Sequence, residues 1–220
     1  MLAVAFMPGS AVEAQSIPSP YTYLERGQEI GFFAGQMSTD AGRFGYAPAG
    51  GPTMGLRYGV ELSGPLAVEG MAGFVNSTRD VIDPGRVEGD RVIGEADARL
   101  ATIDARFRFT FTGRRAWHGL SPFITGGGGI VLDTSGRSEL DDVLLAADVF
   151  EMGTSFFGTL GFGTRWFLTD TFALRADGVF SLWQVDTPPG FSDAARGFES
   201  VEDGEWLPGT SFSVTLLYRW

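Results

Sequence analysis

Apolar and polar side chains alternate with a period of two along most of this chain. The clearest stretch is Asp97 to Phe111, where alternate positions from Ala101 onward are alanine, isoleucine or phenylalanine and the positions between them include two arginines and an aspartate. Successive side chains of a β-strand point to opposite faces, so this pattern predicts a strand with one apolar and one polar face. Eight segments are predicted to be strands on this basis: 29–38, 52–63, 66–76, 97–111, 121–132, 153–168, 172–183 and 210–220.

The connections between the predicted strands alternate between short and long. Those after the second, fourth and sixth strands are short, whereas the other four cover 39–51, 77–96, 133–152 and 184–209. Transmembrane β-barrels have short periplasmic turns and longer extracellular loops. Strands of about 9–11 residues cross a bilayer at a tilt, and closure leaves no backbone group unpaired in lipid. The chain is therefore predicted to be all-β: an eight-stranded antiparallel up-and-down transmembrane β-barrel, with periplasmic termini and extracellular loops.

Alternation alone does not say whether the apolar face meets lipid or a protein core, because a secreted lipocalin-type barrel also alternates. The polar face carries charges of both signs, which are costly against lipid and suit an ion-paired interior. Aromatic residues also gather near both predicted membrane boundaries, as in interfacial girdles. We therefore expect a lipid-facing apolar side. The charged residues expected to line the interior are Arg57, Glu61, Glu69, Asp104, Arg106, Arg108, Arg165, Arg175, Asp177 and Arg219.

The last predicted strand is apolar on one face and ends on an aromatic residue. That face consists of Phe212, Val214, Leu216, Tyr218 and Trp220. The arrangement resembles the assembly signal of bacterial outer-membrane β-barrels. This resemblance implies that the partners are outer-membrane lipid, lipopolysaccharide, the barrel assembly machinery and periplasmic chaperones.

Residues 161–177, with the sequence GFGTRWFLTDTFALRAD, carry a more specific resemblance. They are similar to a hairpin of the small outer-membrane β-barrel proteins of the OmpA/OprF type. Residues 121–124, which enter a glycine-rich strand, resemble the strand before that hairpin. The likeness covers roughly residues 27–220 and implies the barrel fold without implying an activity. The peptidoglycan-binding domain of full-length OmpA-type proteins has no counterpart, so tethering to the cell wall is not expected.

The first residues resemble the end of a secretory signal peptide. Leu2 to Met7 is apolar and Val12-Glu13-Ala14 forms a small-residue cleavage site, although no basic residue precedes Arg26. We expect cleavage after Ala14, a periplasmic segment over 15–28 and the barrel over 29–220.

Composition and charge narrow the possible functions. The net charge of −11 argues against a nucleic-acid partner, and the absence of cysteine excludes thiolate metal sites. The single histidine, His118, lies in a predicted periplasmic turn, which excludes a Ser-His nucleophile pair elsewhere. An aspartate-only or metal-dependent site stays open. We expect no enzyme activity, no catalytic residue, no cofactor and no resident metal.

The long loops are acidic. Asp141-Asp142 and Glu202-Asp203-Glu205 either bridge Ca²⁺ or Mg²⁺ to lipopolysaccharide phosphates or form a solvated, mutually repelling surface, and the second interpretation is the simpler. Residues 140–152 also have amphipathic helical spacing, which predicts a helix in that loop.

Two functions fit these observations. One is a structural role in envelope integrity, or an interaction made by the loops; the other is a narrow porin-like channel for small solutes or ions. The interior of an eight-stranded barrel is just wide enough for side chains to fill. The charged residues expected there favour the structural role, and we expect a monomer.

Overall fold

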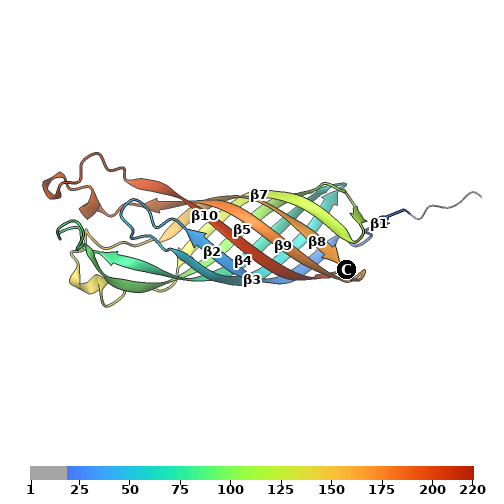
Figure 1. The fold of residues 1–220 in the computed structure, drawn as a ribbon, viewed down its shortest axis with the longest axis horizontal. Helices are drawn as coiled ribbons and strands as arrows, with labels where there is room; N and C mark the ends of the chain where they lie inside the picture. The colour runs from blue at the N-terminus through green and yellow to red at the C-terminus, as the bar shows by residue number, and fades with distance from the viewer. Residues whose placement is uncertain (1–18) are drawn as a thin grey trace, which may run out of the picture.

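The computed structural model describes residues 19–220 (Figure 1). The predicted signal peptide and its cleavage site lie outside the described residues. Three 3-10 turns, η1 (Asp141–Val143), η2 (Pro189–Phe191) and η3 (Ala194–Arg196), lie in the connections. The strands are β1 (Tyr21–Tyr23), β2 (Gln28–Thr39), β3 (Gly50–Ser63), β4 (Leu66–Ile82), β5 (Val92–Thr110), β6 (Arg115–Trp117), β7 (Leu120–Asp133), β8 (Thr154–Phe167), β9 (Phe172–Asp186) and β10 (Gly204–Arg219).

Eight of the strands close into a barrel in which every neighbour is antiparallel. The order is β2-β3-β4-β5-β7-β8-β9-β10, and β10 returns to β2 in register from Gly209↔Thr39 to Arg219↔Glu29. The short strands β1 and β6 pair only with each other and with the start of β7, outside the ring. The predicted fold, a closed eight-stranded antiparallel barrel, is confirmed.

The two ends of the barrel differ (Figure 1). At one end, here called the turn end, lie the short connections 64–65, 111–119 and 168–171, together with β1 and Trp220. At the other, the loop end, lie the long connections 40–49, 83–91, 134–153 and 187–203. The predicted division into short turns and long loops is thus present.

A continuous apolar belt surrounds the turn-end part of the barrel. Its side chains point outward at every second position; the phenyl ring of Phe107, for example, is 65% exposed. The larger belt residues are Ile30, Phe32, Met54, Leu56, Tyr58, Leu62, Leu66, Phe74, Ile103, Phe107, Phe109, Phe111, Ile124, Phe156, Leu160, Phe162, Trp166, Phe172, Phe180, Leu182, Phe212, Val214, Leu216, Tyr218 and Trp220.

Beyond the belt, toward the loop end, the two faces exchange character. In β5, Ala98 and Leu100 point inward and are buried, whereas Asp97 and Arg99 point outward and are exposed. The predicted strands stopped at about this point, because the apolar residues move from one face to the other. The hydrogen-bonded ladder continues, and β4 and β5 pair out to Ile82 and Val92. The protein therefore has an apolar exterior along one part of its length and an apolar interior along the next.

The predicted helix over 140–152 is wrong, since only the 3-10 turn η1 forms there. Asp141 is drawn inward to Arg79, and Phe150 and Met152 pack into the loop-end core. Val143 and Leu145 are left exposed, so the residues of the expected apolar helical face point in different directions. Among residues 19–220, no helix is long and apolar enough to cross a membrane.

Candidate functional site

The lumen is filled in two layers with a small cavity between them. Near the turn end lies a buried cluster of charges, the ionic layer. It consists of Glu29, Arg57, Glu61, Glu69, Asp104, Arg106, Arg108, Arg165, Arg175, Asp177 and Arg219. Alternation places these residues on the inner face of seven strands, and closure of the ring brings them together.

Glu69 on β4 is the centre of the ionic layer. Arg108 on the neighbouring strand β5 and Arg175 on β9, across the lumen, both reach its Oε1 at 2.5 Å. Arg57 lies farther away, at 3.7 Å from Oε2. Charge-assisted bonds of this kind hold strands β4, β5 and β9 at fixed positions across the barrel.

Asp177 forms a second centre nearer the loop end. The Nε of Arg175 donates to both Asp177 oxygens at 2.9 Å, and Arg57 Nη1 donates to Oδ1 at 3.2 Å. Asp104 and Arg106 form a separate pair within β5, with bonds of 2.6 and 3.2 Å.

Glu29 at the start of β2 forms a third centre, nearer the turn end. It accepts bonds from Arg108 and from Arg165, the latter at 3.0 Å, and Arg219 lies 3.8 Å away. Glu61 completes this group at 3.4 Å from Arg165. The ring of Phe167 lies beneath Arg165 and Arg219, a cation–π arrangement that further fills the lumen.

The loop end is closed by a second layer, the apolar cap. Loop residues fold inward onto the upper strand residues, and five aromatic rings pack against one another with centroids about 5–6 Å apart. The rings are those of Phe44, Tyr46, Phe150, Phe191 and Phe198. Burial raises the pKa of Tyr46 to about 12, so this hydroxyl stays neutral.

One buried ion pair ties the loop after β7 to the barrel. Arg79 donates to Asp141 Oδ2 at 2.5 Å, and the Ser138 N–H donates to the same oxygen at 2.7 Å. Burial alone would raise the pKa of Asp141, but these two donors outweigh it and hold the pKa below its ordinary value. Asp141 is therefore a structural anion.

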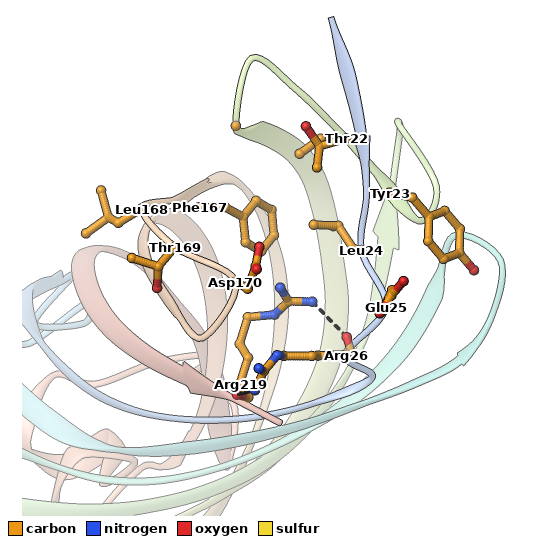
Figure 2. A pocket seen from close by; sticks show the side chains of 12 residues that line it. Thr22, Tyr23, Leu24, Glu25, Arg26, Phe167, Leu168, Thr169, Asp170 and Arg219 are labelled. Carbon is orange, nitrogen blue, oxygen red and sulfur yellow. Dashed lines mark hydrogen bonds between the residues drawn. The ribbon is translucent and has the colours of Figure 1, made fainter. Parts of the chain in front are cut away.

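A pocket of about 440 Å³ opens at the turn end, beneath the segment that precedes β2 (Figure 2). Arg219 Nη2 donates to the Arg26 carbonyl at 2.7 Å, and Arg26 Nη1 donates to the Arg219 carbonyl at 2.9 Å. Leu24 is buried beside them. These contacts lay residues 21–26 across the mouth of the barrel, where they partly cover the ionic layer.

The loop acids do not form a metal site in the part of the chain that the structure describes, where no group of three or more candidate ligands comes together. Asp141 is committed to Arg79, and Glu205 accepts from the Arg43 N–H and lies 3.4 Å from the Tyr46 hydroxyl. His118 sits beside Trp117 at the turn end, away from the long loops.

No family model matches the chain, and no curated protein matches it. Solved structures do match in fold. The outer membrane protein OprG from Pseudomonas aeruginosa is 13% identical over 92% of this chain and 99% of its own, with a TM-score of 0.57. Neisserial surface protein A is 12% identical over 92% of this chain and 98% of its own, with a TM-score of 0.51. This chain has the fold of the small eight-stranded outer-membrane β-barrels.

Within this outer-membrane-type barrel, the ten charged residues singled out from the sequence all lie on the inner face. The structure adds Glu29, which sequence reasoning missed because it is the first residue of its predicted strand. Glu29 lies two residues before Gly31 and four before Phe33, which are also buried. Because every second residue of a strand shares a face, the same alternation places Glu29 on the inner face. The five residues of the predicted assembly signal are exposed and belong to the apolar belt; four of them lie on β10, and Trp220 directly follows it.

Proposed function

We propose that this protein is an integral barrel of a bacterial outer membrane that serves envelope integrity or contacts partners through its loops. The turn end would face the periplasm and the loop end the exterior. The apolar belt supports the membrane location, because an exposed apolar surface that encircles a protein is unfavourable in water and suits hydrocarbon. Lipid and lipopolysaccharide would then be its immediate surroundings, and assembly machinery and chaperones its partners in folding.

The observation that carries the structural role is the filled lumen. A solute passing through would have to cross the ionic layer, whose guanidinium and carboxylate groups are bonded at 2.5–3.2 Å, and then the aromatic cap. The cavity between them measures about 60 Å³. We therefore favour a closed barrel over the alternative, a narrow porin-like channel, and infer no enzymatic role.

Conductance across a planar bilayer tests this proposal. The folded protein should give no step-like current in 1 M KCl, whereas an open porin inserted in the same bilayers should. A matched variant that lacks two of the five cap aromatics, Phe191→Ala with Phe198→Ala, should remain closed because the ionic layer is untouched. Stable unitary steps from the unmodified protein would overturn the closed-barrel proposal and favour the channel.

A further inference from the structure

The cavity between the ionic layer and the apolar cap has an unusual wall. Its volume of about 60 Å³ is several times the roughly 10–15 Å³ that one water-sized sphere requires. Besides apolar side chains, it is lined by two arginines, one carboxylate and six hydroxyl groups. These polar residues are Arg57, Arg106, Asp104, Thr53, Thr102, Thr159, Ser181, Ser211 and Ser213. We propose that this cavity is a binding site for a single monovalent anion of halide size, such as chloride.

The ionic layer has unequal numbers of positive and negative side chains. Among the described residues, the ionic layer contains six arginines and five carboxylates, which leaves one positive charge in excess. Arginine stays protonated in proteins, so proton loss does not remove the excess. Glu61 is moreover shared with Arg114, at 3.5 Å, so the deficit of negative charge is not made up there. A buried charge without a counter-charge is costly, and a small anion would neutralise it.

Arg57, in the wall of the cavity, is one of the arginines of the ionic layer without a carboxylate of its own. Each carboxylate near Arg57 is held more closely by another arginine: Asp177 by Arg175 at 2.6 Å against 3.2 Å for Arg57, and Glu69 by Arg108 at 2.5 Å against 3.7 Å. Arg57 is 1% exposed, and its Nε has no hydrogen-bond partner among the described residues. Arg57 lines the cavity, so one of the two most weakly paired arginines of the layer lies at the proposed site. The other, Arg219, is 3.8 Å from Glu29 and donates to the Arg26 carbonyl at the turn end, away from this cavity.

The side chains in the wall of the cavity offer more hydrogen-bond donors than acceptors. Asp104, the carboxylate of the wall, is already bonded twice by Arg106. The Ser181 oxygen accepts from Trp183 Nε1 at 2.7 Å, which leaves the Ser181 hydroxyl hydrogen free to donate. Thr159 Oγ1 is buried and has no partner in residues 19–220. Hydroxyl groups with a free hydrogen, next to a guanidinium group, can bind a ligand that only accepts hydrogen bonds, such as a halide ion.

The charge and the space together select the class of anion. One excess positive charge matches a monovalent ion. Hydroxyls on β3, β8, β9 and β10 line the cavity from several sides, as a spherical ligand requires, whereas the Thr102 hydroxyl on β5 donates to the Gly73 carbonyl at 3.3 Å. Sulfate and phosphate bring more charge and four oxygens into the same small space. We therefore expect chloride or bromide to bind and sulfate to be excluded.

Bromide provides the test because it scatters X-rays anomalously. Crystals of the folded barrel grown in NaBr should show one anomalous peak in the mid-lumen cavity, next to Arg57. The peak should be lost in Arg57→Gln. It should persist in Thr215→Val, which removes another buried lumen hydroxyl that does not line the cavity. Water alone in the cavity of the unmodified protein, or a peak that survives Arg57→Gln, would overturn the proposal.

A second variant keeps the test decisive if Arg57→Gln fails to fold. Thr159→Val removes one hydroxyl donor from the wall without changing any charge, and it should reduce bromide occupancy at least twofold relative to Thr215→Val. Equal occupancy in the two variants would contradict the site. In solution, replacing sodium sulfate with NaBr at equal ionic strength should lower the unfolding midpoint of Thr159→Val more than that of Thr215→Val, because the general stabilising effect of sulfate is common to both variants and only Thr215→Val keeps the complete bromide site.

Discussion

Arg165 and Arg175 face each other across the β8–β9 hairpin, yet they serve different centres of the ionic layer. Arg175 bonds Glu69 and Asp177, whereas Arg165 bonds Glu29 and Glu61. Alternation placed both arginines in the lumen from sequence alone. It could not choose their partners, because these depend on the register between strands that are distant in the chain. Glu29 in particular meets Arg108 although β2 and β5 are three strands apart in the ring, because both side chains point into the same narrow lumen.

This difference predicts a selective energetic coupling. Asp177→Ala should destabilise the barrel by about 3–5 kcal/mol, since it removes the nearest carboxylate of Arg57 and one of the two carboxylates that bind Arg175. A double-mutant cycle in a lipid-bilayer unfolding titration should give a coupling of roughly 0.5–3 kcal/mol for Asp177 with Arg175, and near zero for Asp177 with Arg165. If Asp177 couples to neither Arg175 nor Arg57, the charges are solvated individually and the lumen is wet.

A second residue-scale prediction concerns the belt. Phe107→Arg, near the middle of the belt, should destabilise by roughly 2–4 kcal/mol in bilayers, because a charge is most costly at mid-membrane. Leu62→Arg is the matched control: Leu62 is similarly exposed, but it lies at the turn end of β3, where the cost falls to roughly 0–1 kcal/mol. Equal losses in the two variants would contradict the assignment of the belt to lipid.

At the scale of elements, the sequence predicted the eight barrel strands well and their loop-end extensions poorly. Strands in the belt keep one phase of alternation, so their apolar face is easy to follow. In β4 and β5 the apolar residues change from the outer to the inner face near Asn76 and Arg99. A prediction that follows one apolar face therefore ends there, although the hydrogen bonds between the two strands continue. The short strands β1 and β6 are too brief to show any period. The apolar cap depends on residues from three long connections coming together, which no local sequence pattern reveals.

The loop after β7 should respond to acid. The pKa of Asp141 is lowered in the folded protein, so its contribution to stability is present above the unfolded pKa of about 3.9 and is lost as the pH falls further, through the folded pKa. Hydrogen exchange of residues 138–152, corrected for intrinsic rates, should therefore accelerate below about pH 3.9.

Two substitutions distinguish the loss of the Asp141–Arg79 ion pair from the effect of protonating other groups at low pH. Asp141→Asn should weaken protection of the loop already at pH 7, because the buried charge that holds Arg79 is gone. Asp142→Asn, at the exposed neighbouring position, should leave exchange unchanged. Unaltered protection in Asp141→Asn would show that the apolar contacts of Phe150 and Met152 hold the loop by themselves.

For the whole molecule, closure of the ring determines how it resists denaturation. An eight-stranded barrel without an open edge gives SDS no strand to detach singly. Unboiled protein should therefore migrate differently from boiled protein on an SDS gel. The same experiment on a chain with Gly35→Val, which would force a side chain into the β10 backbone at the closing pair of strands, should show the boiled position in both lanes. Identical mobility of the unmodified protein with and without boiling would argue against a closed barrel.

The pairing of β2 with β10 also imposes an order in time. The first and last strands of the barrel are neighbours in space, while almost the whole chain separates them in synthesis. Until the residues up to Arg219 have been made and exported, β2 has one edge without a partner, and so does β9. Such an intermediate is unstable in lipid, because the backbone N–H and C=O groups of its unpaired strands have no hydrogen-bond partner there. The protein must therefore be kept unfolded until its last strand arrives, and export has to finish before insertion can.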